Sequence, residues 1–233
     1  MKRLYVMVGG AAVAIAAGLV IASQVGGGSG AKTKPAAAKA AGAAETGALL
    51  RGIPQAGNVL GRAGAPVTLV EFADLQCPYC AQYAVDVMPS LVEEYVRTGK
   101  VKLEFHGLAF VGPDSETALR TVMSAASQNR MWHVLDLLYH NQGAENSGWV
   151  TEPLLRSIGD SVPGLETAAL LGRRSSAEVS NRIAADRSSA DAAGINSTPT
   201  FAVGRSGGPL QILRVGALDP AAFRPALNSL LAG

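Results

Sequence analysis

The two cysteines of the chain, Cys77 and Cys80, form one Cys-x-x-Cys motif, and its place between a strand and a helix constrains the fold. Residues 67–72 (VTLVEF) are β-branched and apolar on both faces except at Glu71, which predicts a buried central strand. Residues 84–95 repeat apolar side chains at three- and four-residue steps, which predicts a helix. The motif therefore lies at the turn from a buried strand into the first turn of a helix.

The rest of the pattern predicts an α/β fold. Residues 101–105 predict a second strand, so that strand, helix and strand form a βαβ unit with parallel pairing and a right-handed crossover. The segments after it follow in the order helical block, strand, strand and helix, at about 113–193, 200–203, 210–215 and 220–231. Asp219 and Pro220 suit the N-cap and the first position of the last helix.

The start of a helix gives the motif its expected chemistry. Unpaired N–H groups and the positive end of the helix stabilise an anion at Cys77, which lowers the pKa of its thiol. Cys80 lies one turn further on and can reach back to close a disulfide. Pro78 suits the first helical turn, where no N–H partner is needed. These features favour a redox-active dithiol.

Two structural roles for the cysteines remain open. Half of a zinc site needs two further ligands, and the chain offers only His106, His133 and His140, of which no two form a close pair. A purely structural disulfide across so short a loop would stabilise the chain little. We therefore expect neither a metal ion nor another cofactor.

Composition narrows the classes of function. Apolar residues make up 48% of the 233, which is enough for a sizeable core. The 20 Lys and Arg residues nearly balance the 18 Asp and Glu residues, so nothing indicates a nucleic-acid-binding protein. Two cysteines are too few for a secreted scaffold held by several disulfides.

The first 51 residues differ in composition from the rest. Lys2 and Arg3 precede the apolar run 4–22, which at ~1.5 Å per residue would span roughly 28 Å, close to the hydrocarbon thickness of a bilayer. We expect residues 1–22 to form a signal peptide or a membrane anchor, with the rest of the chain exported. Residues 23–51 are rich in Gly, Ala and Lys and predict a flexible linker, which leaves 52–233 as the folded domain.

A second element of interest is Thr198-Pro199, in the segment GINSTPTF. A proline fits a sheet only at an edge or at the first residue of a strand, and here it immediately precedes a predicted strand. A cis peptide bond at this position would direct the backbone toward the Cys-x-x-Cys motif. Most bonds before proline are trans, so the residues alone leave the isomer open.

Together these segments resemble a known family. The blocks GIPQAGNVLGRAGAPVTLVEFADLQCPYC and GINSTPTF resemble the DsbA-like branch of the thioredoxin superfamily, and SAASQNRMWHVLDLLYHNQ is similar to the helical subdomain inserted in that branch. The resemblance covers about residues 52–231. It implies a thioredoxin fold, with strands and helices in the order βαβ…ββα and an all-helical insertion at about 113–193.

The resemblance also implies roles for individual residues. Cys77 would carry the attacking thiolate and Cys80 the buried resolving thiol. Glu71 matches the buried acid beneath the active site, which would relay a proton to or from Cys80. Pro199 would be the cis proline before the third strand of the thioredoxin fold. Tyr79 departs from the best-known oxidant of the family, which carries a histidine there and can use its charge to hold the thiolate.

The function expected from this resemblance is that of an extracytoplasmic thiol–disulfide oxidoreductase that introduces disulfides into exported proteins. Substrates with thiols would contact Pro78 and Tyr79 of the motif, and Thr198 and Pro199 would present backbone groups to the substrate chain as an added edge strand. A membrane redox partner, quinone-linked, would reoxidise the enzyme. A disulfide reductase or isomerase in the same compartment is an alternative, as is a chaperone or binding module on the same fold.

Overall fold

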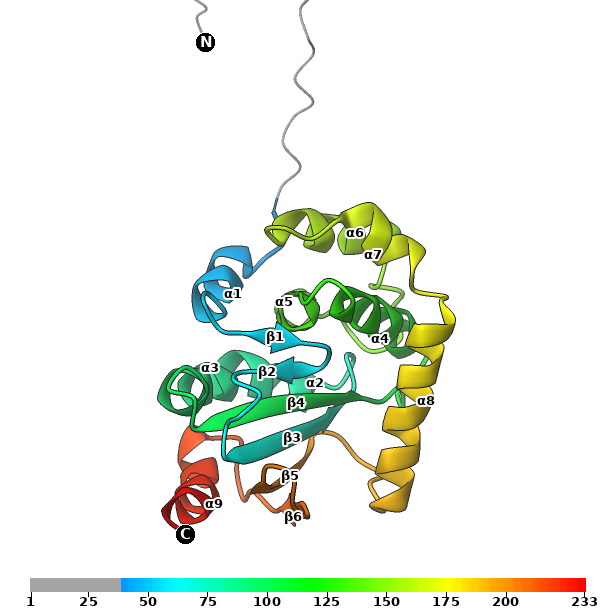
Figure 1. Ribbon diagram of the computed structural model, residues 1–233. Coiled ribbons are helices and arrows are strands. Elements are labelled where there is room, and N and C mark those ends of the chain that lie inside the picture. Colours follow the sequence, from blue (N-terminus) through cyan, green and yellow to red (C-terminus); the bar gives the residue numbers. More distant parts are fainter. Residues whose placement is uncertain (1–38) are drawn as a thin grey trace, which may run out of the picture. The chain divides into compact units, whose positions relative to one another are not determined.

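The computed structural model describes residues 39–233, whose helices and strands are labelled in Figure 1. The signal peptide or membrane anchor predicted at 1–22 lies outside the described residues. Within 39–233, none of the helices combines the length and the apolar character that crossing a membrane requires.

The centre of the fold is a six-stranded sheet in the order β1-β2-β4-β3-β5-β6. The strands are β1 (Gln55–Ala56), β2 (Val59–Leu60), β3 (Val67–Ala73), β4 (Val101–Gly107), β5 (Thr200–Arg205) and β6 (Gln211–Leu213). β3 and β4 are parallel, and β5 is antiparallel to β3. All seven residues of β3 are buried, which confirms the predicted central strand.

A continuous helical segment connects β3 to β4 and completes the predicted βαβ unit. It consists of α2 (Pro78–Gln82), a π-helical turn (Tyr83–Val87), α3 (Met88–Leu91) and a second π-helical turn (Val92–Val96). Pro89 lies within it and cannot donate a backbone hydrogen bond. The wider turn before α3 accommodates this proline, and the helix continues to the end of the segment.

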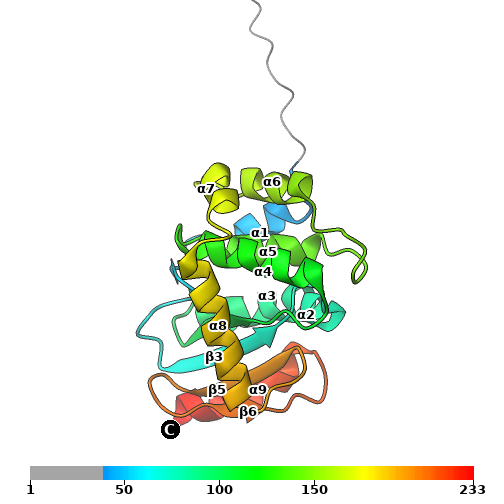
Figure 2. The same ribbon diagram turned by 90° about the vertical axis from the view of Figure 1, so that its right-hand side faces the viewer.

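A block of helices is inserted between β4 and β5, as the sequence predicted. Its members are α4 (Pro113–Ala126), α5 (Met131–His140), α6 (Glu152–Ser161), α7 (Thr167–Gly172) and α8 (Ala177–Ala192). Figures 1 and 2 show α4 to α7 gathered on one side of the sheet, while α8 runs from this block past the sheet toward β5 and β6. The fold is therefore a thioredoxin-like α/β fold with a helical insertion.

The chain ends in α9 (Pro220–Ala232), which begins where the sequence predicted. The Asp219 side chain accepts a hydrogen bond from the Ala221 N–H at 2.6 Å, and Pro220 is the first helical residue. Phe223 of α9 packs edge-on against Phe201 of β5, and both rings lie close to Tyr83. This aromatic cluster fixes β5, and the loop before it, against the helix that carries the motif.

The predicted linker 23–51 is wrong at its C-terminal end. Residues 43–49 form helix α1 (Ala43–Leu49), and the backbone N–H of Ala40 donates to the Ser161 hydroxyl at 2.8 Å. The Thr46 hydroxyl donates to the buried carboxylate of Asp136 at 2.6 Å. These contacts join the segment to α5 and α6, so residues 40–51 belong to the folded domain and not to a linker. The short hairpin of β1 and β2 was also not predicted.

Candidate active site

Cys77 ends the turn between β3 and α2 and is the N-cap residue of α2. Its backbone N–H donates to the Asp74 carbonyl at 3.1 Å, and its own carbonyl accepts from the N–H groups of Cys80 and Ala81 at 3.1 and 3.2 Å. Pro78 follows at the first helical position. Cys77 therefore stands at the start of the helix, as predicted, and both cysteines are free thiols.

Hydrogen bonds surround the Cys77 sulfur. The thiol donates to the backbone carbonyl of Thr198 at 3.3 Å. A hydrogen bond with the Cys80 side chain is the main cause that lowers the pKa of Cys77 from 9.0 to about 6. The Thr198 side chain and the N–H groups of Tyr79 and Cys80 add to this effect, and burial opposes it. Most Cys77 is therefore thiolate at neutral pH.

Cys80 lies one helical turn further on in a different environment. It is completely buried. Burial is the main cause that raises the pKa of the Cys80 thiol well above 9.0, and the hydrogen bond with Cys77 and the charge of Glu71 raise it further. Cys80 therefore remains a protonated thiol at neutral pH, within reach of Cys77.

Glu71 lies beneath the two thiols on β3, where it is 4% exposed. Its neighbours in the sheet are Phe105 on β4 and Phe201 on β5. Its Oε1 atom has no hydrogen-bond partner, and burial, followed by the charge of Cys77, raises the pKa of the carboxyl group to about 8. The predicted burial of Glu71 is confirmed, and the carboxyl group is largely protonated at neutral pH.

Two buried tyrosines border this acidic interior. Burial raises the pKa of Tyr83 and of Tyr139 well above 10, and nearby negative charges add to the effect. The Tyr139 hydroxyl donates to the Asp74 carbonyl at 3.4 Å. The region below Cys77 thus excludes water and disfavours negative charge.

Of the four residues expected to contact substrate, Tyr79 and Pro199 line one groove, whereas Pro78 and Thr198 are not part of its lining. The Thr198–Pro199 peptide bond is cis, and Tyr79 is 63% exposed. Tyr79 and Pro199 line an open groove of about 270 Å³ together with Phe201 and the segment 215–218. The residues that line this groove are mostly apolar.

Sequence reasoning missed the network that holds the turn before Cys77. The carboxylate of Asp74 is completely buried and accepts hydrogen bonds from four groups. The donors are the N–H of Gln76, the hydroxyl of Ser115, and the N–H groups of Phe110 and Val111, at 2.6 to 3.0 Å. The signal that the sequence offered for this network was the polar pair Asp74 and Gln76, which follow an apolar strand and stand immediately before the motif.

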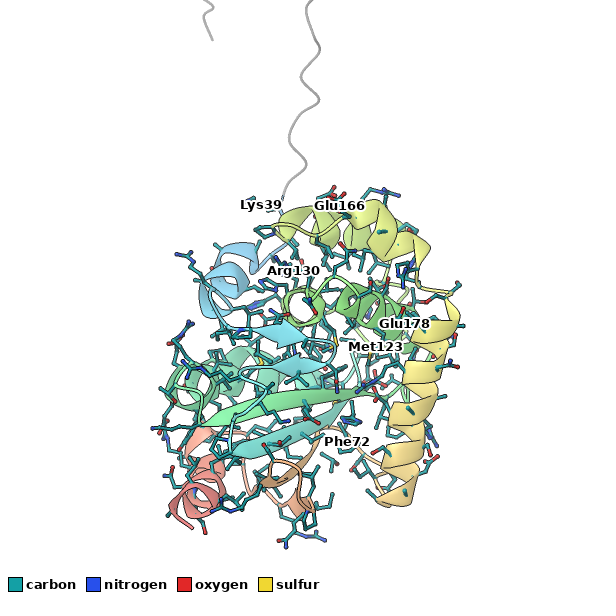
Figure 3. All side chains as sticks on the ribbon, viewed as in Figure 1. Lys39, Phe72, Met123, Arg130, Glu166 and Glu178 are labelled. Atoms are coloured by element: carbon teal, nitrogen blue, oxygen red, sulfur yellow. The ribbon has the colours of Figure 1, made fainter. Side chains whose placement is uncertain are left out.

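The larger cavities lie away from the thiols. One of about 650 Å³ lies between α1 and the start of α5 and is lined by Arg130, which Figure 3 labels within the helical block. Phe72, which Figure 3 labels on the sheet, belongs to a small second cluster that includes Ala190 of α8. Residues 39–233 contain no group of three or more His, Cys, Asp or Glu side chains that could hold a metal ion.

The fold and the paired thiols define a thioredoxin-like dithiol protein, and comparison with known proteins agrees. The thioredoxin family model matches residues 55–207. A probable disulfide bond formation protein D from Bacillus anthracis is 32% identical over 147 residues, covering 62% of this chain and 68% of that protein. The chain therefore belongs to the thioredoxin family, in its DsbA-like branch of thiol–disulfide oxidoreductases.

Two further matches agree with this assignment. A probable disulfide bond formation protein D from Bacillus cereus is 41% identical over 101 residues, or 42% of this chain; the match spans about half of that protein, 47% of its length. The crystal structure of oxidised BdbD from Bacillus subtilis superimposes with a TM-score of 0.67 at 23% identity, covering 78% of this chain and 98% of that one. The second match concerns the fold alone.

Proposed function

We propose that this protein is a thiol–disulfide oxidoreductase that introduces disulfides into exported proteins. The opposite pKa shifts of its two thiols carry the proposal. A Cys77 thiol with a pKa of about 6 is stabilised as the thiolate, which favours the reduced enzyme and makes the Cys77–Cys80 disulfide oxidising. The names of the relatives from Bacillus, disulfide bond formation protein D, support the same direction.

The first step of the proposed reaction begins with the Cys77–Cys80 disulfide. A substrate thiolate attacks the Cys77 sulfur, a mixed disulfide forms, and the electron pair of the broken bond leaves on Cys80. Because Cys80 is buried and has a raised pKa, its thiolate takes up a proton. Glu71, with a pKa of about 8, holds a proton at neutral pH and is the proposed donor.

The second step releases the product. Another substrate thiolate attacks the substrate sulfur of the mixed disulfide, the substrate disulfide forms, and Cys77 leaves as a thiolate. Its low pKa makes it a good leaving group. Two electrons have then passed from the substrate to the enzyme.

We place the substrate chain along the outer side of the motif. Backbone groups at Thr198 and Pro199 would pair with an extended substrate segment, in the manner of an added strand. Pro78 and Tyr79 would contact its side chains, and the groove of about 270 Å³ beside Tyr79 would accept an apolar one. These contacts would orient the substrate sulfur toward Cys77.

The proposed location follows from the first residues of the sequence. The run 4–22 behind Lys2 and Arg3 would direct the domain across the cytoplasmic membrane and anchor it there, or be removed as a signal peptide. A membrane redox partner, proposed to be quinone-linked, would accept the two electrons and restore the disulfide.

The reduction potential of the Cys77–Cys80 pair tests the proposal. Equilibration with glutathione buffers is expected to give a value near or above roughly −150 mV, in the range of DsbA-type oxidants. A value near roughly −270 mV would instead assign a reductase. The Cys77→Ser variant separates both from a chaperone or binding module, which would keep its activity without the thiol.

A further inference from the structure

The helical insertion holds all four residues of the turn that leads to Cys77. The Tyr139 hydroxyl donates to the carbonyl of Asp74, and Ser115 donates to the side chain of Asp74. The side chain of Gln76 bonds to Asn146, accepting from the Asn146 N–H at 2.6 Å. The remaining two residues of the turn, Leu75 and Cys77, are both held by Gln142.

Gln142 lies just after α5, and its side-chain amide donates hydrogen bonds to two backbone carbonyls of the turn. Its Nε2 atom lies 2.8 Å from the Leu75 carbonyl oxygen and 3.2 Å from that of Cys77. An amide nitrogen has two hydrogens, so each carbonyl can take one of them. The Gln142 backbone is fixed in turn by a hydrogen bond to the Tyr139 carbonyl at 3.3 Å.

A hydrogen bond to the Cys77 carbonyl affects the geometry around the Cys77 sulfur. That carbonyl also accepts from the N–H groups of Cys80 and Ala81, so its direction sets the first turn of α2. The same backbone rotation that aims this carbonyl also decides how the Cys77 sulfur faces the N–H groups of Tyr79 and Cys80. A donor from outside the helix therefore restrains the geometry that stabilises the thiolate.

We propose that Gln142 is a positioning residue of the active site, which reaches across from the helical insertion to hold the Leu75 and Cys77 carbonyls and so fixes the thiol at the start of α2. The inference deepens the proposed function and rests on it, because it concerns the same thiol. Gln142 touches neither the sulfur nor the substrate groove, and acts through the backbone of the turn.

The test is the acid dissociation of Cys77 in the reduced protein, followed by the ultraviolet absorbance of its thiolate. Gln142→Met keeps the length of the side chain and removes both donors without adding charge. It is expected to lower the acid-dissociation constant of Cys77 by about three- to tenfold, so that less thiolate forms at a given pH. The disulfide becomes less oxidising by a similar factor against glutathione.

A matched control exists in the same helical insertion. Gln128 donates to the Glu166 carbonyl at 3.3 Å and accepts from the Glu166 N–H at 2.8 Å, so it also bridges two segments by its amide. Figure 3 labels Glu166 on the side of the helical block away from the sheet. Gln128→Met is expected to leave the acid dissociation of Cys77 unchanged, even if it lowers the unfolding temperature as much as Gln142→Met does.

The outcomes separate this inference from the proposed function. Unchanged Cys77 acid dissociation in a folded Gln142→Met variant would overturn the positioning role, as would equal shifts in the Gln128 and Gln142 variants. If Gln142→Met does not fold, Gln142→Asn carries the same test, because its shorter amide cannot reach both carbonyls. Failure of the proposed function would show in the unaltered protein, as a Cys77 pKa near 9 or a reductase-like potential.

Discussion

The two thiols of the motif lie one helical turn apart, yet the surroundings of Cys77 stabilise a negative charge on its sulfur, whereas those of Cys80 disfavour one. Around Cys77, a thiol, a side chain and backbone N–H groups donate hydrogen bonds to the sulfur, and its pKa falls to about 6. Around Cys80, burial is the main effect, the hydrogen bond with Cys77 and then the charge of Glu71 add to it, and the pKa of Cys80 rises well above 9.0. The two pKa values differ because several hydrogen-bond donors face the Cys77 sulfur and few face the Cys80 sulfur.

This difference assigns the order of events in thiol–disulfide exchange. The outer sulfur forms and leaves as a thiolate, whereas the inner sulfur must gain a proton when the disulfide opens. Glu71 lies beneath the inner thiol as a carboxyl group that is itself largely protonated at neutral pH. Changes at the Cys77 sulfur and changes at the Cys80 sulfur should therefore produce different defects in the exchange reaction.

The largest effects are expected from removing one sulfur at a time. Cys77→Ser should abolish exchange, because Cys80 is completely buried and a substrate cannot reach it. Cys80→Ser should keep the reactive outer thiolate and accumulate a mixed disulfide that no inner thiol can resolve. Mass spectrometry after incubation with oxidised glutathione measures both. Equal glutathione adducts on the two variants would show that the sulfurs are equally accessible.

A large effect on stability is expected at Glu71. Its pKa in the folded protein is about 8 against 4.5 for an exposed carboxyl group, so above pH 4.5 the unfolded chain loses a proton that the folded protein keeps. The unfolding free energy should therefore fall as pH rises through this window, by up to roughly 1.4 kcal/mol per pH unit. Glu71→Gln should remove this decline.

Denaturant unfolding of the oxidised protein from pH 5 to pH 8 provides the measurement. The oxidised form is required because the lowered pKa of Cys77 acts in the opposite direction in the reduced protein, where it adds stability as pH rises above about 6. Burial, the main cause of the Glu71 shift, persists after oxidation. A decline of the same slope in Glu71→Gln would locate the buried titration elsewhere.

The smallest effect is expected at the rim of the groove. Tyr79→Ala should raise the KM for a peptide with an apolar residue beside its cysteine by roughly two- to tenfold, because the groove loses one wall. It should leave the Cys77 pKa nearly unchanged, since the backbone N–H of residue 79 remains. Val85→Ala on the same helical segment is the matched control: Val85 is also exposed, at 38%, and lies outside the groove. Equal KM values for both variants would remove Tyr79 from substrate binding.

Local patterns were enough to predict the elements that surround the motif. The buried strand β3, the helical segment after it, the helical insertion and the start of α9 at Asp219 were all predicted, because each has a periodic or capping signal within its own residues. The hairpin of β1 and β2 was missed, since strands of two residues carry no such period. Helix α1 was missed because its stabilising contact, Thr46 with Asp136, joins residues 90 positions apart.

The same distinction applies to the site. The burial of Glu71 followed from its apolar neighbours in one strand. The contributions of Asp74, Gln76 and Gln142 did not, because their hydrogen bonds join the turn before the motif to residues 36 to 70 positions away in the sequence. A polar side chain shows its role only when the fold brings its partner beside it.

One titration tests the central claim most directly: the thiolate absorbance of the reduced protein as a function of pH, repeated with Cys80→Ser to assign the sulfur. One thiolate should form in a step near pH 6, and no second thiolate should form until well above pH 9. In Cys80→Ser, the contact of residue 80 with the Cys77 sulfur is weaker and stabilises the Cys77 thiolate less. The midpoint of the first step should therefore rise above pH 6 but remain below pH 9. Two thiolates forming together near pH 9 would contradict the asymmetry and the oxidase reaction built on it.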